Sequence, residues 1–117
     1  MSEQKPEKQI DYIEIGVTDI ARTKDFYKAV FGWKFEDYGP SYTSFFDGRL
    51  AGGFTTEGLT PGRGVLVVIY ATDLAALQQR VEAAAGKISK PIFSFPGGRR
   101  FHFLDPSGNE LAVWSDM

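Results

Sequence analysis

Two side chains of this sequence could transfer a proton near neutral pH. His102 is the single histidine of the chain, and an unperturbed imidazole titrates at about pH 6.5. Glu14 would act as a general base if it lay at the floor of a pocket that withholds water from its carboxylate. The alternative makes His102 a structural residue of a strand, and makes Glu14 a surface carboxylate paired with a cation such as Arg100. Glu14 and His102 are therefore the candidate catalytic residues, and the sequence assigns them no reaction.

The same residues raise the question of a metal. Glu14, His102 and Glu110 would together supply one nitrogen and two carboxylates, a ligand set that suits a divalent ion. Nothing in their spacing brings the three together. The chain contains no cysteine, which excludes thiolate sites, cysteine nucleophiles and disulfides. We therefore predict no metal site and no cofactor.

Other residues suit recognition of a small molecule. The aromatic side chains Tyr12, Tyr42, Tyr70 and Trp114 are typical of a site for a flat or amphipathic ligand, unless they fill the core instead. Arg100 could hold an anionic group through paired hydrogen bonds. It is one of two adjacent arginines, and neighbours in a strand face opposite sides, so only one of the pair can serve a pocket.

The elements that must position these residues follow from hydrophobic periodicity. Asp19 and Asp73 are predicted to cap the beginnings of two helices, and glycines at positions 32 and 86 to end them. Gly52 and Gly53 weaken one strand, and we attribute them to curvature of the sheet. Alternation and turn signals predict eight strands, over residues 10–18, 33–38, 41–47, 49–55, 65–72, 91–95, 99–104 and 110–114.

The order strand, helix, strand, strand, strand occurs twice, which predicts an internal duplication and an α+β fold. Asp105-Pro106-Ser107-Gly108-Asn109 is a turn signal between two alternating runs, and Asp47-Gly48 repeats it in the first half. The predicted organisation is a flexible segment over 1–9, a first module over 10–56, a linker over 57–64 and a second module over 65–117, all within one domain.

The composition excludes several classes of partner. A net charge of −2 and an isoelectric point near 5.3 provide no electrostatic basis for binding nucleic acid or an anionic membrane. No apolar run approaches the length of a membrane span, and the first residues do not form a signal peptide. We therefore expect a cytoplasmic protein whose partner is a small molecule.

The repeated order and two motifs resemble the vicinal oxygen chelate superfamily, which includes glyoxalase I, fosfomycin and bleomycin resistance proteins and extradiol dioxygenases. The resemblance implies a curved eight-stranded mixed sheet folded into a cup, with helices outside, and a homodimer. The residues that carry it are Asp19, Phe26, Tyr27, Phe31, Gly32, Trp33, Asp105, Pro106, Gly108 and Asn109.

The metal-dependent members of this superfamily hold their ion with His or Glu from four strands. Position by position, the resemblance places the four ligands here at Tyr12, at about Gly52, at Leu66 and at Ala112. Three of these residues have no donor atom in the side chain, and a single tyrosine does not hold a divalent ion. The resemblance therefore argues against the metal-dependent glyoxalase and dioxygenase chemistries for this chain.

Strand alternation identifies which residues would line the cup. Phe101 and Phe103 suit the face that packs on the helices, so Arg100 and His102 point to the other face. The candidate ligand-binding residues are Tyr12, Glu14, Tyr42, Ser44, Leu66, Val68, Tyr70, Arg100, His102, Ala112 and Trp114.

Three functions remain at this point. The favoured one is metal-independent binding of a small apolar or aromatic molecule in the cup. The second is a lyase or isomerase that uses Glu14 or His102 as acid or base. The third is an interaction module whose cup is filled by its own side chains.

Overall fold

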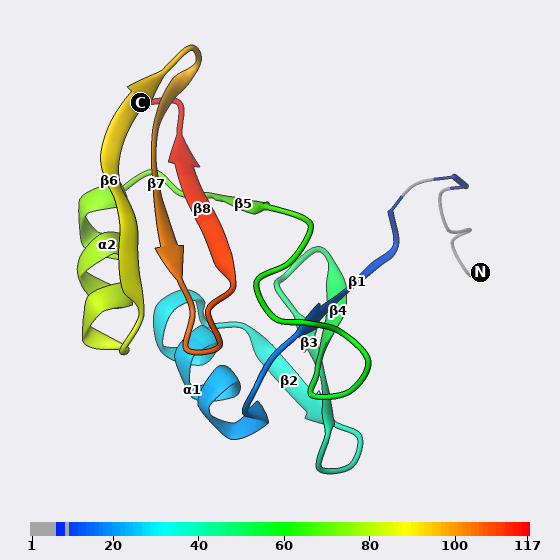
Figure 1. Ribbon diagram of the computed structural model, residues 1–117. Coiled ribbons are helices and arrows are strands. Elements are labelled where there is room, and N and C mark those ends of the chain that lie inside the picture. Colours follow the sequence, from blue (N-terminus) through cyan, green and yellow to red (C-terminus); the bar gives the residue numbers. More distant parts are fainter. Residues whose placement is uncertain (1–6, 9) are drawn as a thin grey trace.

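The computed structural model describes residues 7–8 and 10–117 (Figure 1). Most of the segment expected to be flexible, residues 1–6 and 9, lies outside the described residues. The elements are β1 (Tyr12–Gly16), α1 (Ile20–Phe31), β2 (Lys34–Asp37), β3 (Tyr42–Phe46), β4 (Ala51–Thr55), β5 (Val67–Tyr70), α2 (Leu74–Ala83), β6 (Lys87–Phe95), β7 (Gly98–Leu104) and β8 (Glu110–Ser115).

The predicted α+β fold with two βαβββ modules is confirmed. The eight strands divide between two four-stranded sheets, with orders β1-β4-β3-β2 and β5-β8-β7-β6. In each sheet the first strand of the module pairs parallel with the last, and the remaining pairs are antiparallel. Each sheet is therefore mixed, and β1 and β5 are edge strands of their sheets. Figure 1 shows α2 running alongside β6, and α1 beside the turn between β7 and β8.

Both helices begin where the sequence predicts. The Asp19 side chain accepts a hydrogen bond from the Arg22 amide, and the Asp73 side chain accepts one from the Ala76 amide, each at 3.0 Å. Gly32 ends α1 in the left-handed conformation, with φ of 72°. These capping signals are local in sequence, and for that reason they survive into the folded structure.

The predicted end of α2 at Gly86 is wrong. The helix ends at Ala83, and the left-handed residue that follows it is Ala85, with φ of 72°. Gly86 has a different role, because a Cβ atom there would lie 2.7 Å from both the Phe26 ring and the Val81 side chain. The glycine lets the chain pass close to the core, and its amide donates to the Val81 carbonyl at 2.9 Å where the helix ends.

Strand β6 is longer than its predicted range of 91–95, because it begins at Lys87. Its pairing with β7 shifts register between Ile88 and Lys90 and again between Lys90 and Phe93. Pro91 lies inside this irregular stretch. A proline cannot donate to a strand ladder, and it is tolerated here because β6 is the outer strand of its sheet.

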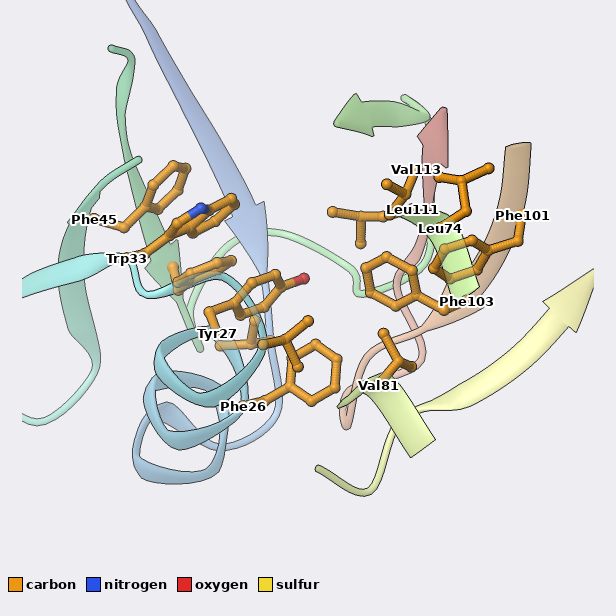
Figure 2. Close-up of a cluster of buried hydrophobic side chains, with 13 residues drawn as sticks. Phe26, Tyr27, Trp33, Phe45, Leu74, Val81, Phe101, Phe103, Leu111 and Val113 are labelled. Carbon is orange, nitrogen blue, oxygen red and sulfur yellow. The ribbon is translucent and has the colours of Figure 1, made fainter. Parts of the chain in front are cut away.

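The two modules share one aromatic core (Figure 2). In the first module Tyr27 stacks on Trp33 and on Phe54, with ring centroids 4.8 and 5.0 Å apart. The stack reaches the second module because Phe26 lies 5.9 Å from Phe103. Since Phe26 belongs to α1 and Phe103 to β7, the core buries apolar surface from both halves of the chain.

The turn after β7 is a polar joint between the modules. The buried Asp105 carboxylate accepts hydrogen bonds from the Tyr27 hydroxyl at 3.0 Å and from the amides of Ser107 and Asn109 at 2.9 Å. Burial, and then the charge of Asp105, raise the pKa of the Tyr27 phenol, so this group remains a donor. The Asn109 side chain in turn donates to the Gly16 carbonyl at 2.8 Å.

In the corresponding turn of the first module, the described hydrogen bonds of the aspartate side chain stay within the turn. Asp47 is exposed, and its carboxylate accepts from the amides of Arg49 at 2.8 Å and Leu50 at 2.6 Å, both within the same turn. The two turns have the same local design, and only the second connects the modules.

Candidate functional site

Four of the predicted ligand-binding residues come together on the first sheet. Tyr12 and Glu14 lie on β1, Tyr42 and Ser44 lie on β3, and all four point away from the aromatic core. The Tyr42 hydroxyl donates to Glu14 Oε2 at 2.8 Å and lies 2.6 Å from the Tyr12 hydroxyl, which is also 3.5 Å from Ser44 Oγ. We call Tyr12, Glu14, Tyr42 and Ser44 the tyrosine–glutamate cluster.

Gly53 makes this cluster possible. A Cβ atom at Gly53 would collide with the hydroxyl and ring of Tyr42, which lies across the β4 backbone at that point. Gly52 faces the other side, where a Cβ atom would collide with the Phe45 ring. The glycine pair therefore provides close approach of aromatic rings on both faces of the sheet, a reason that the prediction of sheet curvature did not include.

The register of β1 and β4 bears on the ligand position that the resemblance places at about Gly52. Gly53, not Gly52, pairs with Glu14 and faces the tyrosine–glutamate cluster. The positions that the resemblance implies are then Tyr12, Gly53 in place of Gly52, Leu66 and Ala112, and Tyr42 fills the space in front of Gly53. This donor set does not fit a divalent ion.

His102 and Glu110 form a second polar group, on the second sheet. His102 Nδ1 lies 2.8 Å from Glu110 Oε2, and the His102 side chain is only 4% exposed. The Nε2 atom is buried and has no hydrogen-bond partner among the described residues. The Phe93 ring lies over the imidazole, with centroids 5.8 Å apart.

Arg100 does not pair with Glu14. Its guanidinium lies 5.5 Å from the centroid of Phe93 and 5.2 Å from that of Phe95, so the charge rests against two aromatic rings of β6. The Glu14 partner is Tyr42 instead. The surface ion pair considered from the sequence is therefore not what these two residues form.

The remaining predicted residues lie along β5 and β8. Tyr70 and Trp114 pack edge to face with centroids 5.2 Å apart, and the Tyr70 hydroxyl donates to Asp116 at 2.8 Å. Val68 is 45% exposed, whereas Ala112, its partner across the two strands, is fully buried. Tyr70, Trp114, Val68 and Ala112 share the face that carries His102, as alternation predicts.

The larger cavity lies between the two edge strands. It has a volume of about 790 Å³ and is lined by β1, by the segment that joins the modules, and by the first residues of β5 and β8. Its charged residues are Glu14, Glu110 and Arg63, and most of the others are apolar or glycine. Among the predicted ligand-binding residues only Glu14 and Leu66 line it. Arg63 and the segment around it were missed, because a sequence rich in glycine and proline indicates a connection and nothing more.

A second cavity of about 590 Å³ lies beside the first. It is lined by Leu66, Val68 and Tyr70 of the β5 region and by residues of the first module that include Trp33 and Phe45. The predicted site residues are thus distributed over two cavities and two sheet faces.

The three residues considered as a relocated metal site do not form one. Glu14 and Glu110 line the same cavity, but His102 bonds to Glu110 outside its lining. Over residues 7–8 and 10–117, no group of three or more His, Cys, Asp or Glu side chains is placed to hold a metal ion. In the same part of the chain, no helix has the length and apolar character needed to cross a membrane.

Comparison with known proteins agrees with this geometry. The model of the Glyoxalase/Bleomycin resistance protein/Dioxygenase superfamily matches residues 9–113. The chain is 34% identical over 124 residues to the anthracycline biosynthesis protein DnrV of Streptomyces peucetius, a match that covers 88% of this chain and 45% of that protein. DauV of Streptomyces sp. (strain C5), also an anthracycline biosynthesis protein, matches over the same shares. The chain thus spans less than half the length of these curated relatives.

Two solved structures illustrate the likeness in fold. A glyoxalase-related enzyme from Fulvimarina pelagi superposes with a TM-score of 0.80 at 19% identity, covering 92% of this chain and 88% of that one. The fosfomycin resistance protein FosX from Mesorhizobium loti superposes with a TM-score of 0.75 at 16% identity, covering 92% of each chain.

Proposed function

Because the chain belongs to the glyoxalase/bleomycin resistance protein/dioxygenase superfamily, we propose that it binds a small aromatic molecule, without a metal, in the cavity between β1 and β5. One observation carries the proposal. The cavity of about 790 Å³ has the size of a small-molecule site and a mostly apolar lining, and it includes a carboxylate, Glu14, held in place by Tyr42. The relatives named as anthracycline biosynthesis proteins support an aromatic ligand.

The donor set supports binding without a metal. Tyr12, Gly53, Leu66 and Ala112 occupy the family's ligand positions, and three of them have no side-chain donor. The space in front of Gly53 is taken by the Tyr42 ring. The protein's contribution is then the shape of the cavity and the hydrogen bonds at Glu14.

Calorimetric titration with 2-naphthol, a planar aromatic probe, tests this proposal. We expect saturable binding that is unchanged by prior treatment with EDTA. Leu66→Arg puts a charged side chain into the cavity lining and should weaken binding about tenfold or more. Met117→Arg is the matched control, because Met117 is 70% exposed and lies outside both cavities. If neither 2-naphthol nor larger planar aromatic molecules bind, the proposal is wrong.

An acid–base reaction is the second candidate function, and it rests on His102. A proton on Nδ1, shared with Glu110, would leave Nε2 as a hydrogen-bond acceptor and a potential base. The described residues cover Nε2, however, so a ligand would have to displace side chains such as Phe93 to reach it. Binding is therefore the better supported function.

We also propose that the protein is a homodimer. Val65 is 82% exposed, Tyr70 50% and Val68 45%, and together they form an apolar surface along an edge strand. A second copy of the chain that covers β5 would bury this apolar surface.

The mass in solution tests the dimer. We expect light scattering to give twice the 13.0 kDa of one chain. Val68→Glu should shift the mass towards the monomer, because it places a charge in the interface. Lys34→Glu, at an exposed position of β2, should leave the mass unchanged. A wild-type mass of one chain at high protein concentration would contradict the proposal.

A further inference from the structure

We infer that the tyrosine–glutamate cluster is a hydrogen-bond acceptor site, which selects ligands that present an O–H or N–H group to Glu14. The inference rests on the proposed function, because it concerns the polar contact of the same ligand in the same cavity. It adds to the proposed aromatic character of the ligand the requirement for a hydrogen-bond donor.

The first step is the direction of the hydroxyl protons. Glu14 is exposed, and a carboxylate accepts hydrogen bonds without donating any. Tyr42 therefore donates its single proton to Glu14 Oε2 at 2.8 Å. The contact of 2.6 Å between the two phenol oxygens then needs the proton of Tyr12. Ser44 donates to the Gly52 carbonyl at 3.2 Å. All three hydroxyl protons are thus used inside the cluster.

The second step concerns the hydrogen-bonding groups that the cluster leaves free for a ligand. Glu14 lines the cavity and keeps its second carboxylate oxygen, while Tyr12, which lies outside the lining, is 42% exposed and its oxygen keeps a free lone pair. Both are acceptors. A ligand that brings only carbonyl or ether oxygens finds no donor in the cluster, and the polar groups it covers lose their contact with water.

The third step is that the arrangement is held rigidly. Tyr42 lies against the β4 backbone at Gly53, and its ring cannot take this position over any larger residue. Desolvation, together with the hydrogen bonds to Tyr12 and Glu14, raises the pKa of Tyr42, so Tyr42 keeps its proton at physiological pH. The cluster therefore presents acceptors under all ordinary conditions.

The charged residues that line the cavity also favour a ligand that donates hydrogen bonds. Glu14 and Glu110 contribute two carboxylates to its lining, and Arg63 contributes one guanidinium. Because the carboxylates outnumber the guanidinium, a ligand whose donor is a protonated amine should bind more tightly, and a ligand that carries a carboxylate should bind more weakly. A neutral hydroxyl group satisfies the acceptors without regard to charge.

Four probes with one ring system separate these cases. 2-Naphthol brings a neutral donor, 2-naphthylmethylamine a cationic one, 2-methoxynaphthalene only an acceptor, and 2-naphthoate an anion. We expect 2-naphthol and the amine to bind about tenfold more tightly than 2-methoxynaphthalene, with 2-naphthoate weakest. In Glu14→Gln the amine should lose more affinity than 2-naphthol, because only the amine depends on the negative charge.

Tyr42→Phe gives a readout that a merely structural role would not produce. Without the Tyr42 oxygen, the Tyr12 proton loses its acceptor at 2.6 Å and, of its described acceptors, retains the weaker contact of 3.5 Å with Ser44 Oγ, so 2-methoxynaphthalene should gain affinity relative to 2-naphthol. Tyr38→Phe is the control, because Tyr38 touches the Tyr42 ring while its hydroxyl lies outside the cluster.

The outcomes separate the two proposals. If 2-naphthol and 2-methoxynaphthalene bind wild type equally, and Leu66→Arg weakens both, the acceptor site is disproved and the proposed function stands. The acceptor site is equally disproved if the preference for 2-naphthol persists in both Tyr42→Phe and Glu14→Gln. If none of the four probes binds, the acceptor site is disproved, and the proposed function is disproved as well if larger planar aromatic molecules also fail to bind.

Discussion

Replacing Asp105 with alanine is expected to lower the free energy of unfolding by about 3–5 kcal/mol. The carboxylate is 4% exposed and accepts hydrogen bonds from two amides, from the Tyr27 hydroxyl and from the Asn109 side chain. Tyr27 is fully buried, so its hydroxyl would be left without a partner and without access to water. The cost exceeds that of one hydrogen bond because buried groups from both modules lose their acceptor at once.

Chemical denaturation followed by circular dichroism measures this loss, and the chain contains its own control. Asp47 occupies the equivalent turn of the first module, is exposed, and within the described residues accepts from the amides of Arg49 and Leu50 alone. Asp47→Ala should cost about 1 kcal/mol. Equal losses in the two variants would show that Asp105 stabilises only its own turn, and the account of a joint between modules would be wrong.

Phe54→Ala should destabilise the protein by a similar amount, about 3–5 kcal/mol. The side chain is fully buried at the centre of the aromatic stack, with ring centroids 4.8 Å from Phe45 and 5.0 Å from Tyr27. Alanine removes the transfer free energy of the ring and leaves a cavity between rings. These rings are held by a helix and a sheet, so they cannot close the space fully.

The control for this variant lies on the neighbouring strand. Phe46 is 47% exposed, so Phe46→Ala should cost less than about 1 kcal/mol. Both changes in the free energy of unfolding can be obtained from the midpoints of urea denaturation, provided that the dependence of this free energy on urea concentration is the same in the variants. A loss for Phe54→Ala as small as that for Phe46→Ala would mean that the stack is loosely packed.

The sequence predicts the elements of this fold because their signals are local. Asp19 and Asp73 cap their helices through contacts with residues three positions on, and the turn at Asp105 binds amides within four residues. Alternation also places Tyr12 with Glu14 on one face of β1, and Tyr42 with Ser44 on one face of β3, since side chains of a strand alternate whatever the partner. These features need no knowledge of tertiary structure.

The site itself depends on contacts between distant residues, and the sequence does not predict those. Tyr42 reaches Glu14 only by leaning along the sheet over Gly53, and nothing in the local pattern of either strand indicates this direction. The course of the segment over 57–64 is set by the bond from the Gly62 amide to Asn109 and by the close approach of Leu59 to Gly16. A cavity lined by that segment is visible only after the chain has folded.

The turn at Asp105–Asn109 has a consequence for how a duplicated protein diverges. The two turns have the same local design, yet within the described part of the chain only the second holds the partners of Tyr27 and of the Gly16 carbonyl. A chain made of two second modules would lack Tyr27, and one made of two first modules would lack Asn109, which donates to the Gly16 carbonyl. The halves have become complementary parts, so substitutions in α1 and in the turn after β7 are tied to one another across 78 positions of sequence.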